Sequence, residues 1–255
     1  MQNNTFSGLF VGQNLVKLSA VASTNAYVKE VLSNSAPLPE GTVIMAENQF
    51  EGRGQQQNTW LSEPGKNLTF SVLLSPGFLQ ITQQFELNKA ISLAVLDVLK
   101  PLLGSSVSIK WPNDVLVDKQ KIAGILIENI VQGSRWKHAV IGIGLNVNQT
   151  EFPDSLNATS ISTILHRDCD LNQLLADLCR AIEARYLALK SRKFDRIHQE
   201  YLNGLYKFED SATFKLGHEL KTGRIIGVSN IGLLQIDFGD QICEFGFKEI
   251  AFIID

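Results

Sequence analysis

Apolar residues recur at two different spacings along the chain. Positions three or four residues apart indicate amphipathic helices, whereas short continuous or alternating apolar runs indicate strands. Helices are predicted over residues 23–32, 81–99, 159–165, 171–189 and 194–206, and we expect Pro101 and Gly104 to end the second of them. Strands are predicted over residues 42–46, 68–74, 107–110, 115–117, 122–128 and 137–143. The body of the chain is therefore predicted to have an α+β fold.

The pattern changes from Ala212 onward. Five short β runs follow one another there, separated by Gly and Asn turns. Short strands at such close spacing are typical of a small barrel. We therefore expect two domains, a larger one over residues 1–206 and a small β domain over residues 207–255.

Composition and charge narrow the class of protein. The 255 residues are 44% hydrophobic and 19% charged, which indicates a globular chain. The 23 basic and 26 acidic residues give a net charge of −3, so we expect no nucleic-acid partner. The chain lacks an apolar run of about 18 residues and a signal-peptide pattern, so no membrane association is expected. Its three separated cysteines fit a reducing compartment, and we expect a cytoplasmic protein.

A polar loop of about twenty residues separates the first two predicted strands, and long loops of this kind are often functional. Within it, Gly52 and Gly54 flank Arg53. Two glycines let the backbone turn several N–H groups toward one anion, and a guanidinium suits phosphate. A surface turn with a solvated arginine explains the same triplet. The glycine spacing fits neither a dinucleotide-binding fingerprint nor a P-loop.

Three further segments carry candidate chemistry. Asn113 and Asp114 follow a Pro-containing turn and offer oxygen ligands for a hard cation such as magnesium, although an Asx turn would need the same residues. Lys121 begins a very apolar strand that contains Gly124. A later strand contains both Gly142 and Gly144. Glycine inside a strand often marks a close approach of a ligand to the backbone.

Taken together, these segments resemble the catalytic domain of the biotin–protein ligases, also called biotin–acetyl-CoA-carboxylase ligases. The resemblance covers nearly the whole chain. It implies a mixed, mostly antiparallel sheet flanked by helices, as in class II synthetases, and a C-terminal barrel of the Src-homology-3 kind. The matching pieces, in the order of the family, are Ser23-Thr24-Asn25, then Gln49, Gly52-Arg53-Gly54 and Trp60, then Lys110-Trp111-Pro112-Asn113-Asp114, then 121–126, and then Gly142-Ile143-Gly144-Leu145-Asn146.

Two positions depart from the family pattern. Gln55 stands where relatives often have a second arginine, and Gln57 stands where many have glycine. Some relatives also carry a winged helix-turn-helix repressor domain before the ligase. Here the Ser23-Thr24-Asn25 motif comes so early that we expect the short form without that domain.

The resemblance implies a two-step reaction. Biotin and ATP form biotinyl-5′-adenylate and pyrophosphate, and a lysine of a biotin carboxyl carrier protein then attacks the acyl carbon and releases AMP. Lys121 and Arg53 are the implied catalytic residues, and Asp114 is the candidate magnesium ligand. The implied biotin site comprises Ser23, Thr24, Asn25, Gln49, Gly52, Arg53, Gly54, Gln55, Lys121, Gly124, Gly142 and Gly144. The implied ATP site comprises Arg53, Trp60, Lys110, Asn113, Asp114 and Asn146.

Other functions fit parts of the pattern. Lipoate–protein ligases and octanoyl transferases share the broad fold and also acylate a carrier lysine, but the segment 110–114 and the Gly52-Arg53-Gly54 loop favour biotin. A non-catalytic carrier-binding scaffold would be expected to lack Lys121 or Arg53, and both are present. A DNA-binding repressor is disfavoured by the net charge. The sequence leaves a monomer and a homodimer both open.

Overall fold

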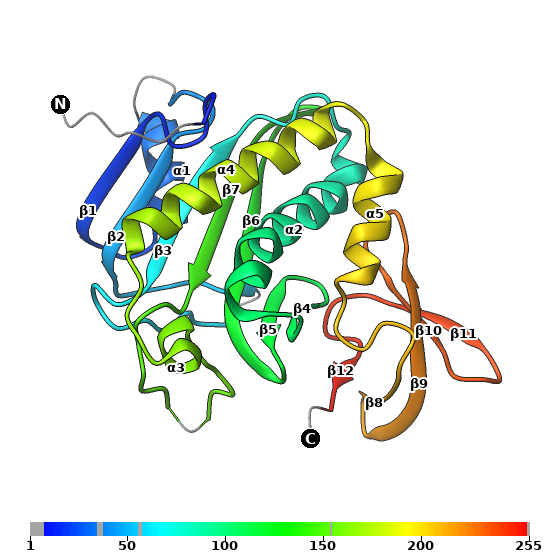
Figure 1. Ribbon diagram of the computed structural model, residues 1–255. Helices are drawn as coiled ribbons and strands as arrows, with labels where there is room; N and C mark the ends of the chain where they lie inside the picture. The colour runs from blue at the N-terminus through cyan, green and yellow to red at the C-terminus, as the bar shows by residue number, and fades with distance from the viewer. Residues whose placement is uncertain (1–7, 35–37, 56–57, 154, 254–255) are drawn as a thin grey trace.

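The computed structural model describes residues 8–34, 38–55, 58–153 and 155–253 (Figure 1). Its helices are α1 (Thr24–Asn34), α2 (Gln84–Leu103), α3 (Ile161–Leu165), α4 (Leu171–Lys190) and α5 (Phe194–Asn203), with a short 3-10 helix at Ile81–Gln83. The first seven strands are β1 (Leu15–Val21), β2 (Val43–Gln49), β3 (Leu68–Leu74), β4 (Val107–Lys110), β5 (Asp114–Val117), β6 (Gln120–Gln132) and β7 (Arg135–Leu145). The last five are β8 (Ser211–Leu216), β9 (Glu219–Val228), β10 (Leu234–Asp237), β11 (Ile242–Phe245) and β12 (Ala251–Phe252).

The body is built on a seven-stranded sheet with the order β1-β2-β3-β7-β6-β5-β4. The pair β1 and β2 is parallel and is connected through α1, and the other neighbouring pairs are antiparallel. This confirms the predicted α+β fold with a mostly antiparallel sheet. β1 was not predicted. It is an edge strand whose residues are half-buried or exposed, so its apolar signal is weak.

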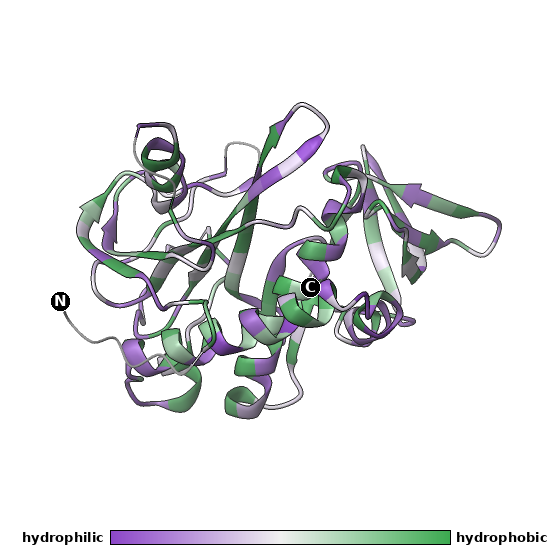
Figure 2. Ribbon diagram, turned by 90° about the horizontal axis from the view of Figure 1, so that it is seen from above, coloured by the Kyte–Doolittle hydropathy of each residue, from purple (hydrophilic) through white to green (hydrophobic). Residues whose placement is uncertain are grey.

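Helices cover both faces of this sheet. The amphipathic helices α2, α4 and α5 pack on one face, where the larger hydrophobic core lies. On the other face, Val28 of α1 packs against Ile44, Leu73 and Val140 from three strands. Figure 2 shows that hydrophobic and hydrophilic residues both occur along the helices, as expected for elements with one buried side.

Several predicted helix boundaries are wrong: α3 begins at Ile161 rather than at 159, and α5 ends at Asn203 rather than at 206. Pro101 does not end α2, which continues to Leu103. Pro101 lies in the last turn, where it removes one backbone hydrogen bond, and the helix ends two residues later. Gly104 follows with a φ of 88°, and it ends the helix as predicted.

The C-terminal strands form a second, antiparallel sheet with the order β11-β10-β9-β8-β12. Phe214, Ile225 and Ile236 are buried within it. The indole Nε1 of Trp111 donates a hydrogen bond to the Gly232 carbonyl at 3.0 Å, and this bond ties the second sheet to the body. Among the described residues, no helix is long and apolar enough to cross a membrane.

Candidate active site

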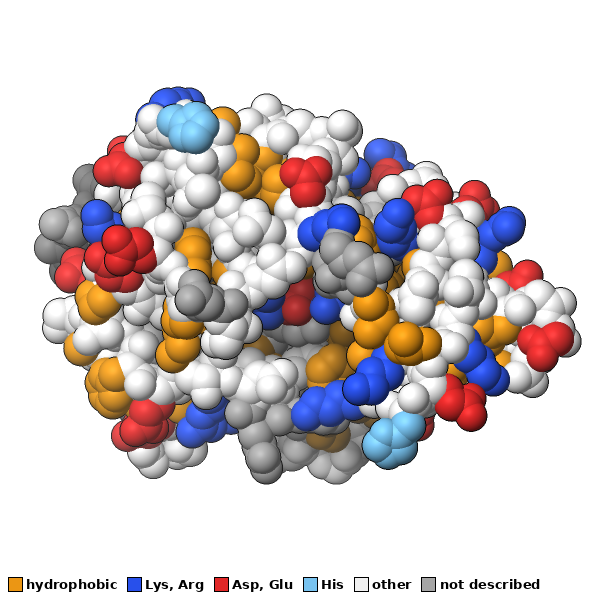
Figure 3. Space-filling view, turned by 90° about the horizontal axis from the view of Figure 1, so that it is seen from below, with side chains coloured by type: hydrophobic (Ala, Val, Ile, Leu, Met, Phe, Trp, Pro, Cys, Tyr) orange, Lys and Arg blue, Asp and Glu red, His pale blue; other side chains and the backbone are white. Residues whose placement is uncertain are grey.

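A cavity of about 450 Å³ lies on the face of the large sheet that α1 flanks. Successive strand residues point to opposite faces. Val140 lies on the α1 face, so Gly142 and Gly144 of the same strand also point to that face. Gly124 is paired with Gly144 in the neighbouring strand and completes a floor without side chains. Figure 3 shows a hollow in this side of the molecule, with basic and acidic side chains inside it.

The glycines of the floor make room for side chains of the protein itself. A Cβ atom on Gly144 would lie 2.3 Å from Cε2 of Trp60, and one on Gly142 would lie 2.7 Å from Oδ1 of Asn25. A Cβ on Gly124 would lie 3.2 Å from Cε of Lys121. The first two distances are shorter than those that real Cβ atoms show, and the third is tighter than most real Cβ contacts. The strand glycines therefore let Trp60, Asn25 and Lys121 reach the sheet surface.

Lys121 reaches the cavity because β6 contains a bulge. The pairing of β5 with β6 shifts between Val115 and Leu116, so that Ile122 and Ala123 both lie in the core. An extra residue of this kind reverses the alternation of a strand and re-aims the side chains beyond it. Lys121, three residues before Gly124, consequently lies on the cavity face. Its backbone N–H donates to the Asn157 carbonyl at 2.8 Å, which fixes the strand there.

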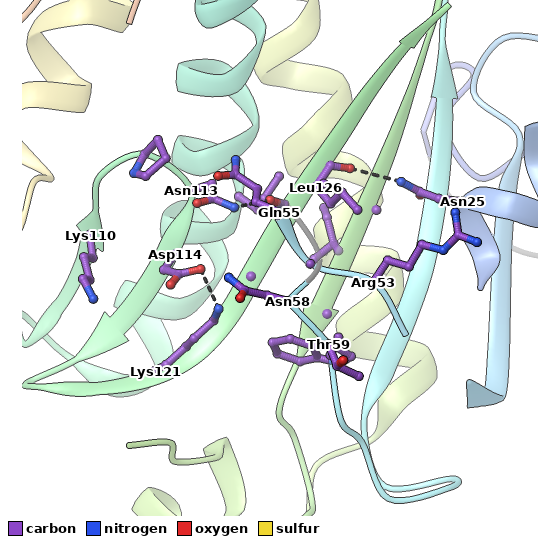
Figure 4. A pocket seen from close by; sticks show the side chains of 18 of the residues that line it. Asn25, Arg53, Gln55, Asn58, Thr59, Lys110, Asn113, Asp114, Lys121 and Leu126 are labelled. Atoms are coloured by element: carbon purple, nitrogen blue, oxygen red, sulfur yellow. Dashed lines mark hydrogen bonds and ion pairs between the residues drawn. The ribbon is translucent and has the colours of Figure 1, made fainter. Parts of the chain in front are cut away.

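Three charged side chains gather at this end of the cavity. Lys121 Nζ is 2.6 Å from Asp114 Oδ1, with both side chains partly exposed. Figure 4 shows Lys110 on the same side of the cavity, beyond Asp114. Lys110 Nζ lies 5.8 Å from the ring centroid of Phe252 in the second sheet. Burial lowers the pKa of Lys110; Asp114 opposes this effect and the positive charge of Lys121 adds to it.

The Gly52-Arg53-Gly54 segment forms one arm of a small hairpin. Arg53 pairs with Thr59, and the Gly54 N–H donates to the Asn58 carbonyl at 2.7 Å. The Arg53 side chain is exposed and points away from Lys121 in Figure 4. Gly52 is buried, and a Cβ there would lie 2.2 Å from the Trp60 carbonyl oxygen. Gly52 is thus required for the close pairing of the hairpin. Gln57 lies outside the described residues.

The opposite end of the cavity is polar and nearly neutral. Ser23, Thr24 and Asn25, at the N-terminus of α1, are each 3% exposed. The Thr24 N–H donates to Gln49 Oε1 at 2.9 Å, which orients the Gln49 side chain. A buried hydroxyl below them, from Ser71 on β3, lies within hydrogen-bonding distance of both Thr24 and Asn25. This end suits a neutral ligand with several donors and acceptors.

Two asparagines proposed for ATP have structural partners. Asn113 Nδ2 donates to the Ile125 carbonyl at 2.5 Å and holds the β4–β5 turn against β6. Asn146 Nδ2 donates to the Thr159 carbonyl at 3.0 Å, and its buried Oδ1 has no hydrogen-bond partner among the described residues. Asn113 contributes to the cavity lining, whereas Asn146 does not.

Most residues named from the sequence line this one cavity. They are Ser23, Thr24, Asn25, Gln49, Arg53, Gly54, Gln55, Trp60, Lys110, Asn113, Asp114, Lys121, Gly124, Gly142 and Gly144. Gly52 and Asn146 are not part of the lining. The sequence analysis did not identify the lining residues Asn58, Thr59, Thr69, Phe70, Phe247, Lys248, Ile250, Ala251 and Phe252. Those from 247 onward carried no sequence signal, because docking of the second sheet brings them to the cavity.

The residues around the cavity could hold a magnesium ion only together with ligands from a bound nucleotide and water. Asp114 is the one acidic side chain among the described lining residues. No group of three or more His, Cys, Asp or Glu side chains in the described parts of the chain is placed to hold a metal. Magnesium often binds through one or two carboxylates, with substrate phosphates and water completing the octahedron. The lining therefore fits magnesium that arrives with a nucleotide rather than a permanent metal centre.

Comparisons with known proteins agree with this geometry. Residues 18–146 match the biotin/lipoate A/B protein ligase family. The chain is 36% identical over 240 residues to the bifunctional ligase/repressor BirA of Bacillus spizizenii, covering 91% of this chain and 72% of that protein. It is 32% identical to a biotin–[acetyl-CoA-carboxylase] ligase of Mycobacterium tuberculosis, over 69% of this chain and 66% of the relative.

A solved structure extends the similarity to the whole fold. The biotin protein ligase from Aquifex aeolicus, in complex with biotin and ATP, superposes with a TM-score of 0.79 at 28% identity. The superposition covers 95% of this chain and 100% of that chain. Sequence and structure thus agree over both the cavity and the elements around it, and the chain belongs to the biotin/lipoate A/B protein ligase family.

Proposed function

We infer that this chain is an ATP-dependent biotin–protein ligase that biotinylates a lysine of a biotin carboxyl carrier protein through biotinyl-5′-adenylate. The observation that carries this function is one cavity with a neutral polar end, a floor of glycines and a charged end formed by Lys110, Asp114 and Lys121. The relatives named as biotin ligases, and the Aquifex aeolicus ligase that holds biotin and ATP, support it.

Biotin has a neutral ureido ring and an apolar chain that ends in a carboxylate. We assign the ring to the polar end, where Ser23, Thr24 and Gln49 supply donors and acceptors. The chain then runs along Gly142 and Gly144 beside the indole of Trp60. The buried Nε1 of Trp60 has no hydrogen-bond partner among the described residues. The carboxylate reaches the end where Lys121 stands.

The first step joins two anions. A carboxylate oxygen of biotin attacks the α-phosphorus of ATP, and the bond to pyrophosphate breaks. A preorganised ammonium lowers this barrier by offsetting the repulsion between them. Lys121 takes this role, since it faces the cavity and its present partner is the single carboxylate of Asp114. Arg53 supplies a second cation when the hairpin folds over the phosphates, and the N–H group of Gln55 adds a dipole, whereas the Gly54 N–H is held by the Asn58 carbonyl.

The nucleotide occupies the charged end beneath the second sheet. Lys110 and Trp60 line its site, and Asn113 and Asn146 support it by holding the surrounding backbone. Asp114 would hold a magnesium ion together with the phosphates, and that ion would supply positive charge against the leaving pyrophosphate. Gly52 belongs to the biotin site indirectly, because it permits the hairpin that carries Arg53.

In the second step the ε-amine of the carrier lysine attacks the acyl carbon of the adenylate. The amide bond forms, the amine loses a proton, and AMP leaves with the electron pair of the broken bond. The mixed anhydride must be protected from water until the carrier arrives. Residues 247–252 border the cavity, so the second sheet contributes to this protection. We assign residues 207–255 to a separate domain of the Src-homology-3 kind and propose no nucleic-acid partner. A monomer and a homodimer both fit.

The test is exchange of labelled pyrophosphate into ATP by the purified protein. We expect exchange to require biotin, because only the bound carboxylate can accept the adenylyl group. Transfer to a biotin carboxyl carrier domain should follow and release AMP. Exchange driven equally well by lipoate or octanoate would instead assign the chain to another activity of the same family.

A further inference from the structure

A chain of polar contacts runs beneath the polar end of the cavity; it is buried at Ser71 and ends in a partly exposed ion pair. Lys29 Nζ contacts Glu128 Oε1 at 2.5 Å, and Asn25 Nδ2 donates to Glu128 Oε2 at 2.9 Å. The Ser71 hydroxyl lies 2.6 Å from Asn25 Oδ1 and 2.7 Å from Thr24 Oγ1. Glu128 itself does not line the cavity.

The first contacts fix how the Asn25 amide is turned. A carboxylate and a backbone carbonyl can only accept hydrogen bonds. The Asn25 nitrogen faces both, since it donates to Glu128 and, at 3.3 Å, to the Leu126 carbonyl. Turning the amide over would set its oxygen against two further oxygens. Lys29 occupies the other carboxylate oxygen, so Glu128 keeps Oε2 directed at Asn25.

The amide orientation then decides where the Ser71 proton goes. Asn25 Oδ1 faces Ser71 and cannot donate, so the short contact between them needs the single Ser71 hydroxyl proton. The Thr24 oxygen competes for that proton and is left short of a donor. Thr24 directs its own proton to Gln49 Oε1 at 3.2 Å. Thr24 is a lining residue and is almost fully buried, so its Oγ1 offers a lone pair at this end of the cavity.

We propose that Glu128, held by Lys29, is a positioning residue that makes Thr24 a hydrogen-bond acceptor and so selects ligands with a ring N–H. The inference rests on the proposed function, since the N–H it selects is that of the biotin ureido ring. A buried acceptor without a donor carries a full desolvation cost, which a ligand N–H removes. A ligand without that N–H leaves the cost in place.

The test replaces Glu128 by an uncharged group of the same shape. Glu128→Gln can donate as well as accept, so it no longer fixes the Asn25 amide. We expect the KM for biotin to rise about tenfold, the effect of one lost hydrogen bond. The KM for ATP and the rate at saturating biotin should stay near the wild-type values. Glu30→Gln, the same change at an exposed position of α1, should leave all three unchanged.

A second measurement separates positioning from general loosening. Biotin methylated at a ureido nitrogen lacks one N–H, and wild-type protein should discriminate against it. The preference for biotin over the methylated analogue should shrink in Glu128→Gln and in Ser71→Ala, because both change which groups donate hydrogen bonds beneath Thr24. Lys29→Met provides a milder perturbation should Glu128→Gln fail to fold, as judged by circular dichroism.

The outcomes are distinct. If the wild-type protein shows no biotin-dependent pyrophosphate exchange, the proposed function itself is refuted. If the wild type exchanges normally, unchanged biotin KM and unchanged discrimination in folded Glu128→Gln or Lys29→Met would refute only the role of Glu128. An equal rise in the KM for biotin and for ATP would also refute it, because that result indicates a general distortion of the cavity.

Discussion

Replacing Lys121 by alanine separates its contribution to stability from its contribution to catalysis. The Lys121 and Asp114 side chains are 36% and 26% exposed. Solvent screens such a pair, and exposed ion pairs contribute about 0–1 kcal/mol to the free energy of unfolding. Asp114 also keeps Lys110 as its cross-strand neighbour after the change. We therefore expect Lys121→Ala to fold normally, with a melting temperature close to that of the wild type.

The Lys121 ammonium is expected to contribute much more to the stability of the transition state than to the stability of the fold. Two unit charges about 3 Å apart interact by about 5 kcal/mol at an effective dielectric constant of about 20, and partial exposure reduces this value. Loss of one preorganised group that stabilises developing charge commonly costs about 3–4 kcal/mol, or a factor of 10² to 10³ in rate. We expect biotin-dependent AMP formation by Lys121→Ala to fall by about this factor.

The control uses the other lysine of the cavity. Lys110 lies on the far side of Asp114 and under Phe252, so we expect Lys110→Ala to reduce activity less and to raise mainly the KM for ATP. Both variants are followed by circular dichroism and by AMP release at saturating biotin and ATP. An inactive Lys110→Ala beside a nearly wild-type Lys121→Ala would show that the charge acting on the α-phosphate comes from Lys110.

Two further predictions concern the cavity floor and the half-buried Lys110. Gly144→Ala should raise the KM for biotin about tenfold or more, because the new Cβ would lie 2.3 Å from the Trp60 indole and must displace it. Gly77→Ala is the matched control, since its Cβ would meet no atom closer than 3.8 Å. Unchanged biotin binding and unchanged Trp60 fluorescence in Gly144→Ala would contradict this prediction. Burial lowers the pKa of Lys110, so its charged form opposes folding at pH values below the folded-state pKa, and the penalty disappears as the pH rises toward the pKa of the unfolded chain. Thermal melts should therefore show Lys110→Met more stable than the wild type near pH 7, with a gap that narrows toward pH 10, whereas a constant gap would show that packing causes the difference.

The local sequence pattern was sufficient to predict the bounds of elements that bury one regular face. The strands Leu68–Leu74 and Val107–Lys110 have the predicted bounds, and α4 begins at the predicted residue. The N-terminus of α4 carries a clear signal, since the Asp170 side chain accepts hydrogen bonds from the backbone N–H groups of Asn172 and Gln173. The five C-terminal strands were likewise predicted from their turns. β1 was missed because an edge strand with exposed positions lacks the apolar contrast that identifies buried strands.

The candidate site was predicted in composition but not in geometry. Glycines inside strands were recognised as unusual, yet the sequence could not show that Gly142 accommodates Asn25 and Gly144 accommodates Trp60. The bulge that turns Lys121 into the cavity is fixed by backbone bonds to residues 157–159, which lie far away in the sequence. Alternation alone would place Lys121 on the face opposite Gly124. Contacts of this kind depend on tertiary packing, which no local pattern records.

On the proposed assignment of the site, the arrangement of charge across the cavity explains how one sheet can serve both recognition of the ring and activation of the carboxylate. Recognition of a neutral ring needs buried polar groups whose donors and acceptors are fixed. Such groups require a rigid surface from which water is largely excluded. Activation of a carboxylate needs cations that are free to interact with incoming anions, and such groups must remain partly hydrated. The first set rests on α1, β3 and β6, and the second on the β4–β5 hairpin and the bulge of β6. β6 carries Glu128 at one end of this span and Lys121 at the other. Displacing this strand would therefore disturb ring recognition and carboxylate activation together, whereas single substitutions at either end should separate them.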